Sequence, residues 1–162
     1  EQIPADDDAF TFVFSRDMFA HVEDAEVALC ECARVHAPRG VMVVHQVFAT
    51  DLLEPIEAAQ VIGHTAAVPE RFSADGFEQA AISARFTIEN LEVVGSEWYE
   101  ASQEAGTAPN YLLQVSRLRR AREALIEEIG ETAYRVVYGN ALWSINQMLG
   151  KLESRIYTLG RS

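Results

Sequence analysis

The chain has 162 residues, of which 49% are hydrophobic and 23% charged, and this is enough for one domain with its own core. Its formal net charge of −12 argues against a nucleic-acid partner, because phosphate recognition usually needs a basic face. No stretch approaches the roughly 18 uninterrupted apolar residues of a membrane span, and no signal peptide opens the sequence, so we expect a cytoplasmic protein without a membrane partner.

The first predicted element is a strand over residues 10–15, rich in aromatic and β-branched side chains, which ends on Ser15, Arg16 and Asp17. In open α/β sheets ligands bind at this carboxyl edge. Asp17 and His21 share a face if a helix begins near Asp17, and a carboxylate with an imidazole can orient and deprotonate an acceptor. The alternative interpretation is a helix N-cap at Asp17 and a surface histidine at His21.

A helix over about 24–36 comes next, with acidic residues at its start, and Pro38-Arg39-Gly40 ends it. Residues 41–48 form a second, largely apolar strand of the kind found in buried parallel positions. Cys30 and Cys32 point to different faces of the helix, so we expect reduced packing cysteines rather than a disulfide. The four histidines are scattered without metal-ligand spacing, and we predict no metal site.

Alternating strands and helices continue to the end of the chain and predict an α/β sheet. The later elements are a helical or loop excursion over 55–69, a helix over 73–85, a strand over 86–98, a long amphipathic helix over 109–129, a second helix over 131–149 and a last strand over 154–159. The basic cluster Arg117, Arg119, Arg120 and Arg122 is followed by glutamates, which favours a solvated helix face.

From Phe10 to Val47 the sequence resembles the second half of a class I S-adenosylmethionine-dependent methyltransferase of the type 11-like, small-molecule kind. The resemblance rests on Ser15-Arg16-Asp17 with His21, on Ala33-Arg34-Val35 and on Pro38-x-Gly40. The Ser-Arg-Asp-x-x-x-His form is similar to that of small-amine N-methyltransferases, such as the phosphoethanolamine and sarcosine/dimethylglycine types. Only the first fifty residues match specifically.

The resemblance implies a Rossmann-like methyltransferase sheet, of which the predicted strands are the fourth to the seventh. Residues 1–162 would be the C-terminal part of a single domain, and residues 107–150 a helical insertion or cap before the last strand. The family's Gly-rich cofactor loop would lie before Glu1, so we expect a missing N-terminal half, and weak or no binding of S-adenosylmethionine by this chain alone. Arg39 stands where the family prefers glycine, and a positive φ there would cost about 1 kcal/mol.

The resemblance also implies methyl transfer to a small-molecule acceptor through an amine, hydroxyl or carbon. His21 is the first candidate for the general base, and Asp17 would hold a cationic amine or orient the imidazole. Ser15 and Arg16 would border the methionine end of the cofactor. His45 has either the role of an alternative base or a structural, solvent-facing one.

The sequence allows alternative interpretations at two further points. The aromatic residues of the insertion either line a pocket for a cationic or apolar acceptor or belong to its core; these are Tyr111, Tyr134, Tyr138 and Trp143. The alternative to an enzyme is a non-catalytic half-domain that dimerises or binds a partner through the exposed edge of an incomplete sheet.

Overall fold

The computed structural model describes residues 2–65 and 67–161. It consists of two compact units. Residues 1–48, 68–94 and 154–162 form the first, which we call the sheet unit, and residues 49–67 and 95–153 form the second, the helical unit.

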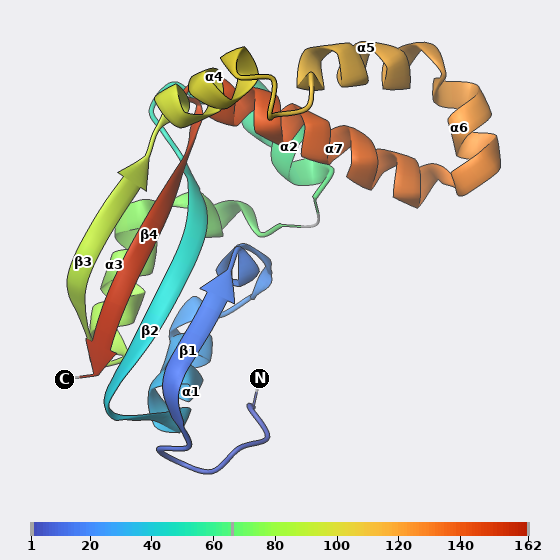
Figure 1. Ribbon diagram of the computed structural model, residues 1–162. Coiled ribbons are helices and arrows are strands. Elements are labelled where there is room, and N and C mark those ends of the chain that lie inside the picture. The colour runs from blue at the N-terminus through green and yellow to red at the C-terminus, as the bar shows by residue number, and fades with distance from the viewer. Residues whose placement is uncertain (1, 66, 162) are drawn as a thin grey trace. The chain divides into compact units, whose positions relative to one another are not determined.

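The sheet has four strands, β1 (Phe10–Arg16), β2 (His36–Ala49), β3 (Phe86–Val94) and β4 (Leu152–Arg161). Their order across the sheet is β1-β2-β4-β3, so the last strand lies between the second and the third (Figure 1). β1 and β2 are parallel, whereas β3 and β4 are antiparallel. The predicted α/β class with an open, Rossmann-like sheet is confirmed.

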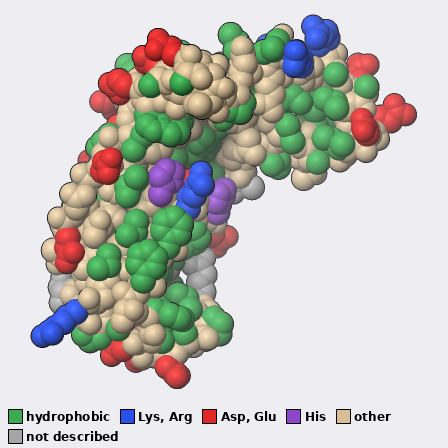
Figure 2. All heavy atoms as spheres, viewed as in Figure 1, with side chains coloured by type: hydrophobic (Ala, Val, Ile, Leu, Met, Phe, Trp, Pro, Cys, Tyr) green, Lys and Arg blue, Asp and Glu red, His purple; other side chains and the backbone are tan. Residues whose placement is uncertain are grey.

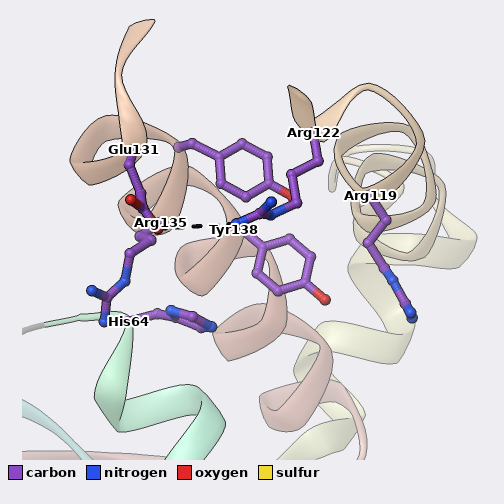
Figure 3. A pocket seen from close by; sticks show the side chains of 7 residues that line it. His64, Arg119, Arg122, Glu131, Arg135 and Tyr138 are labelled. Atoms are coloured by element: carbon purple, nitrogen blue, oxygen red, sulfur yellow. Dashed lines mark ion pairs between the residues drawn. The ribbon is translucent and has the colours of Figure 1, made fainter. Parts of the chain in front are cut away.

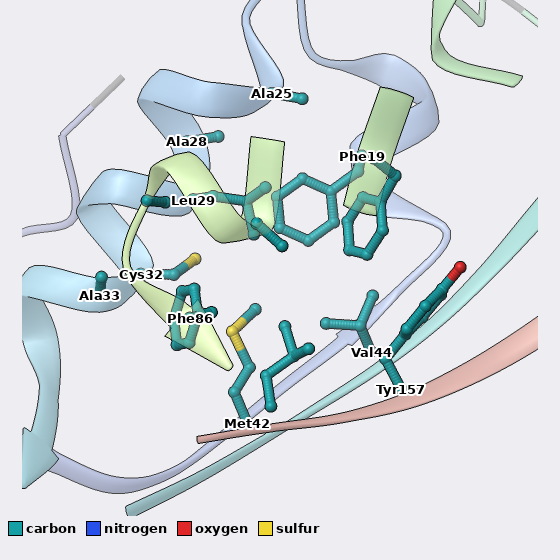
Figure 4. Packing of buried hydrophobic residues seen from close by; sticks show 14 of the residues in the cluster. Phe19, Ala25, Ala28, Leu29, Cys32, Ala33, Met42, Val44, Phe86 and Tyr157 are labelled. Atoms are coloured by element: carbon teal, nitrogen blue, oxygen red, sulfur yellow. The ribbon is translucent and has the colours of Figure 1, made fainter. Parts of the chain in front are cut away.

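Helices α1 (Ala25–Val35) and α3 (Ala74–Ser83) pack on one face of this sheet (Figure 1). Each begins at a side-chain cap, because Asp24 accepts a hydrogen bond from the Val27 amide and Ser73 accepts one from the Gly76 amide. The buried core between helices and sheet contains Leu29 of α1, Met42 and Val44 of β2, and Tyr157 of β4 (Figure 4). Both helices begin where the sequence predicts.

The other face of β1 is exposed. Because side chains alternate along a strand, Phe10, Phe12 and Phe14 all point away from α1, with exposed fractions of 44%, 59% and 59%. Phe12 lies opposite Val41 of β2, which is 37% exposed. Hydrophobic side chains gather on this side of the sheet in the space-filling view (Figure 2).

The start of β2 contains an irregularity at the segment that the sequence predicts as a helix stop. Phe10 pairs with His36 and Phe12 with Val41, so residues 37–40 of β2 lie opposite Thr11 alone. Arg39 has the predicted positive φ, at 63°. Gly40 is required, because a Cβ there would lie 2.9 Å from the carbonyl oxygens of both Ala37 and Thr11.

The helical unit is built around α7 (Glu131–Met148) (Figure 1). Four shorter helices pack against it: α2 (Pro55–Gly63), α4 (Ser96–Glu104), α5 (Tyr111–Arg120) and α6 (Arg122–Ile129). Helices α5, α6 and α7 fall within residues 107–150, the predicted insertion. That they serve as a cap stays a prediction.

Two predicted boundaries are wrong. Residues 109–129 form two helices instead of one, because the chain turns at Ala121 and both α5 and α6 pack against α7. The strand predicted over 86–98 ends at Val94, where pairing with β4 stops at Ser154, and Ser96 begins α4 instead.

Candidate functional site

Asp17 is held at the carboxyl edge of the sheet by three contacts with β2. Its amide donates to the His45 carbonyl at 2.8 Å, its Oδ1 accepts from the Val47 amide at 3.1 Å, and its Oδ2 lies 3.5 Å from Nδ1 of His45. The backbone of Asp17 is left-handed, with φ 52°, a conformation that aspartate tolerates better than most residues. The turn after β1 thus fixes a carboxylate beside an imidazole.

His45 lies on β2 directly opposite Arg16 of β1. Its side chain is 23% exposed and that of Asp17 34%, so both remain accessible from solvent. Nδ1 of His45 is buried towards Asp17 and is too far from it for a normal hydrogen bond. A carboxylate in this position can orient the imidazole.

His21 is the last residue of a short 3₁₀ helix, η1 (Met18–His21). The sequence predicts an α-helical turn there. A 3₁₀ helix has three residues per turn, so positions four apart point about 120° away from each other. The observed helix geometry therefore does not place Asp17 and His21 on the same face, contrary to the sequence prediction. The alternative interpretation is also incorrect in part, because the Asp17 side chain makes no cap hydrogen bond to η1 and binds the Val47 amide instead.

Two buried polar side chains near the ends of β1 and β2 have no hydrogen-bond partner among the described residues. They are Ser15, which is 7% exposed, and Gln46, which is fully buried. An unsatisfied buried polar group costs about 1–3 kcal/mol. A polar ligand or water at this edge would remove that cost, and Ser15 accordingly fits the predicted contact with a cofactor. Arg16 is exposed on the opposite face of β1.

The helical unit contains a separate cavity of about 450 Å³ (Figure 3). Its lining consists of His64, Arg119, Arg122, Glu131, Tyr134, Arg135 and Tyr138. Two of the four aromatic residues singled out in the sequence thus line a cavity. The surrounding arginines do not suit a cationic acceptor, which is one of the alternatives that the sequence leaves open.

Sequence reasoning missed Arg135 and His64 as members of this cavity. Arg135 follows Arg119 and Arg122 along the chain but belongs to α7, and His64 caps α2, so only the packing of α2 and α5 on α7 brings them together. Burial, followed by the nearby charge of Arg135, lowers the pKa of His64 from 6.5. The imidazole is therefore largely neutral at pH 7.

Neither cysteine is disulfide-bonded in the part of the chain that the structure describes. Cys32 is buried, and this burial raises its pKa to about 11, whereas Cys30 is exposed and does not have the packing role expected for it. Within residues 2–65 and 67–161, no group of three or more histidine, cysteine or acidic side chains is arranged to bind a metal. No helix in these ranges is long and apolar enough to cross a membrane.

Comparison with known proteins connects the first part of the chain to a family. Residues 1–44 match the model of the family described as "Methyltransferase domain". A search of curated protein sequences finds no match.

Solved structures match nearly the whole chain. A Galdieria sulphuraria protein assigned as a sarcosine dimethylglycine methyltransferase is 19% identical, with a TM-score of 0.63 over 97% of this chain and 55% of its own. The [4+2]-cyclase SpnF is 17% identical, with a TM-score of 0.67 over 99% of this chain and 52% of its own. Phosphoethanolamine N-methyltransferase 2 from Haemonchus contortus, solved with S-adenosyl-L-methionine, is 14% identical, with a TM-score of 0.58 over 97% and 34%.

These comparisons confirm the resemblance to class I methyltransferases and the fold that it implies. At such low identities the structural likeness shows the fold alone. The chain spans about half the length of the first two solved structures and a third of the last. The cofactor of this family of folds is S-adenosylmethionine, with which one of these neighbours was solved.

Proposed function

We propose that this chain is the acceptor-side portion of an S-adenosylmethionine-dependent methyltransferase that acts on a small molecule in the cytoplasm. The observation that carries the proposal is the Asp17–His45 pair, with Oδ2 and Nδ1 3.5 Å apart, at the carboxyl edge of a methyltransferase-type sheet. This edge is where ligands of open α/β sheets bind. The match of residues 1–44 to the methyltransferase domain supports the same reaction.

In this proposal His45 is the general base and Asp17 orients it. When bound, S-adenosylmethionine supplies an activated methyl group, and an amine, hydroxyl or carbon acceptor must lose a proton as it receives this group. The Asp17 carboxylate faces Nδ1 of His45 at 3.5 Å, which leaves Nε2 for the acceptor proton. His21 is the second candidate for the base. Ser15, whose Oγ lacks a partner, and Arg16 would contact the methionine end of the cofactor.

The acceptor class rests on the neighbours. Two of them carry names of small-amine methyltransferases, one for sarcosine and dimethylglycine and one for phosphoethanolamine. Asp17 would then either hold a cationic amine or orient the base. The cyclase among the neighbours makes a direct test of methyl transfer necessary, because the same fold is found in a protein named for another reaction.

The test uses the longest natural chain that carries this sequence, because the resemblance places the Gly-rich loop before Glu1. Calorimetric titration with S-adenosylmethionine measures cofactor binding, and transfer of a labelled methyl group to sarcosine, dimethylglycine and phosphoethanolamine measures turnover. We expect His45→Ala to lower kcat about 100-fold or more without weakening cofactor binding, because general-base catalysis contributes about 10²–10⁴. Full turnover in His45→Ala together with its loss in His21→Ala would transfer the role to His21.

A second function is favoured by the exposed phenylalanines of β1, which lie on an edge strand. Such an edge supports self-association or docking on a partner chain without catalysis. Sedimentation velocity separates the two functions. A concentration-dependent dimer that Phe12→Glu abolishes, in a protein that does not bind S-adenosylmethionine, would establish the binding module, whereas cofactor binding by a monomer would exclude it.

A further inference from the structure

The cavity of the helical unit combines cationic and aromatic side chains around one space. Its volume of about 450 Å³ lies within the range of about 300–1,000 Å³ typical of small-molecule sites. We propose that it binds an organic phosphate, with the phosphate on the arginines and the organic part on the tyrosines. This site goes beyond the proposed methyl transfer, because all its residues belong to the helical unit and none of them to the Asp17–His45 pair.

The charge of the lining selects an anion. Three arginines contribute three positive charges, Glu131 contributes one negative charge, and His64 is largely neutral, which leaves a net charge of +2. A phosphate monoester carries about −1.5 to −2 at pH 7, whereas a carboxylate carries −1. The positive net charge of the lining therefore matches a phosphate better than a carboxylate. A positively charged cavity is unusual in a chain whose net charge is −12.

The arginines are spread over three helices and do not form a single exposed row. Arg119 comes from α5, Arg122 from α6 and Arg135 from α7, and all three line the cavity. Arg119 and Arg135 lie at opposite sides of it, with Arg122 between them (Figure 3). Guanidinium groups bind phosphate oxygens through pairs of parallel N–H donors. Arg135 is already oriented, because it donates to the Gly63 carbonyl at 2.8 Å. Arg122 lies 3.9 Å from Glu131, a long ion pair that a phosphate could replace.

The half-buried ring of Tyr138 offers an aromatic surface to the organic part of the ligand, and the buried ring of Tyr134 supports it. Tyr134 and Tyr138 are stacked, with ring centroids 5.9 Å apart and an interplanar angle of 10°. The guanidinium of Arg122 lies over Tyr134 at 5.9 Å, and the ring of His64 meets Tyr138 edge-on at 5.6 Å. Planar groups of a ligand gain contact area on such rings at low entropic cost.

His64 provides the polar group that distinguishes this cavity from a surface patch. Its Nδ1 is buried and has no hydrogen-bond partner among the described residues. Its ring can approach α7 closely because position 139 is glycine, where a Cβ would lie 2.6 Å from the Cβ of His64. A neutral imidazole offers one donor and one acceptor, so it can bond a phosphate oxygen or a hydroxyl of the ligand.

Calorimetric titration of the intact chain with phenyl phosphate tests the site, with benzoate, phenol and inorganic phosphate as comparison ligands. We expect phenyl phosphate to bind at least tenfold more tightly than benzoate or inorganic phosphate, and phenol to show no binding. Arg119→Gln and Arg135→Gln should each weaken phenyl phosphate binding at least tenfold. Arg117→Gln is the matched control, because it removes the same charge from α5 at an exposed position outside the cavity lining, and it should change Kd less than twofold.

Glu131→Gln gives a result that loss of folding cannot imitate. Removing this carboxylate frees Arg122 and raises the local charge, so binding of phenyl phosphate should become at least threefold tighter. The proposal is overturned if the chain does not bind phenyl phosphate, if benzoate binds equally well, or if Arg117→Gln weakens binding as much as Arg119→Gln does. Absence of phenyl phosphate binding would not contradict the proposed methyl transfer, because the titration involves neither S-adenosylmethionine nor His45.

Discussion

The sheet unit and the helical unit bury their hydrophobic side chains very differently. In the sheet unit α1 alone contributes six buried residues, and fully buried side chains such as Phe48, Tyr157 and Leu159 connect both helices to the strands. In the helical unit α4 and α6 have no buried residue, and α5 has only Val115. The first unit depends on a continuous core, the second on helix contacts with α7.

Polar groups differ between the units as well. The sheet unit places one carboxylate and one imidazole in defined contact at a strand edge, whereas the helical unit surrounds a cavity with several cations and aromatic rings. A carboxylate–imidazole pair suits general acid–base catalysis, in which a single proton moves between fixed atoms. A cavity lined by cations and aromatic rings suits the binding of a charged ligand. The two units thus differ in packing and in the kind of polar site that each contains.

Phe77→Ala should produce the largest effect on stability. The ring contacts Phe19, Phe48 and Tyr157, with centroids 5.4, 5.8 and 5.1 Å away, and it is 5% exposed. Its removal should lower the free energy of unfolding by about 3–5 kcal/mol. Trp98→Ala in α4, where the side chain is 61% exposed, should cost no more than about 0.5 kcal/mol. Urea denaturation measures the free energy of unfolding of both variants. Similar losses of stability in the two would contradict the difference in packing between the units.

Gly139→Ala should be the most damaging small substitution in the helical unit. A Cβ at this position would lie 2.6 Å from the Cβ of His64, so α7 and the end of α2 would have to separate. Overpacking of this kind costs about 1–3 kcal/mol. It should also displace His64 and weaken phenyl phosphate binding.

Gly63→Ala is the matched control for Gly139→Ala. It adds the same methyl group at the end of α2, where no atom of another described residue lies within 4 Å of the new Cβ. Alanine has the higher helix propensity, so we expect no loss and a gain of up to about 1 kcal/mol. A loss in Gly63→Ala as large as that in Gly139→Ala would mean that neither value reports on the packing of His64.

The sequence predicts the sheet unit far better than the helical unit, for a physical reason. The caps Asp24 and Ser73, the periodic apolar residues of α1 and the apolar run of β2 are local signals, and each corresponds to an observed element. Ala121 carries no such signal. The chain turns there because α5 and α6 both contact α7, and such long-range contacts are not visible in the local pattern.

The candidate site was predictable only in part. Polar residues at the end of β1 mark the correct sheet edge, and the choice of Asp17 follows from them. His45 is predicted only as an alternative base, because the pairing register that brings it opposite Arg16 depends on the irregularity at residues 37–40. Spacing along the chain favours His21, whereas the three-dimensional contact involves His45.

Each unit contains a helix with a side-chain N-cap hydrogen bond of the same length, so the effect of losing the cap can be compared between the units. Asp24 accepts from the Val27 amide at 2.9 Å in α1, and Asn110 accepts from the Leu113 amide at 2.9 Å in α5. Replacement of either by alanine should cost about 1 kcal/mol, because one amide at the helix start loses its partner. Amide hydrogen exchange measures both. We expect Asp24→Ala to leave exchange in the middle of α1 unchanged, since the core holds that helix, and Asn110→Ala to accelerate exchange throughout α5.

The smallest effect concerns the N-terminal segment of the sheet unit, where polar contacts add to the packing of Ile3 against the core. Glu31 of α1 accepts from the Ile3 amide at 3.0 Å and from Arg34 at 2.9 Å. The hydrogen bonds from Arg34 and then from Ile3 lower the pKa of Glu31 from 4.5 to about 2. Because the pKa is lower in the folded chain, the contribution to stability is complete above pH 4.5 and is lost as the pH falls towards 2.

Exchange of the Ile3 amide measures this contribution directly. Relative to its intrinsic rate, protection of this amide should be constant above about pH 5 and should decrease between pH 4.5 and pH 2, as the carboxylate that accepts its hydrogen bond is protonated. Glu31→Gln should lower protection at neutral pH and remove most of this pH dependence. Glu26→Gln, which neutralises an exposed carboxylate of the same helix, should leave the profile unchanged. If both variants had the same profile, the N-terminal segment would be held by the general charge of α1 and not by the specific bonds of Glu31, and the contrast between a cored sheet unit and a polar attachment would have to be abandoned.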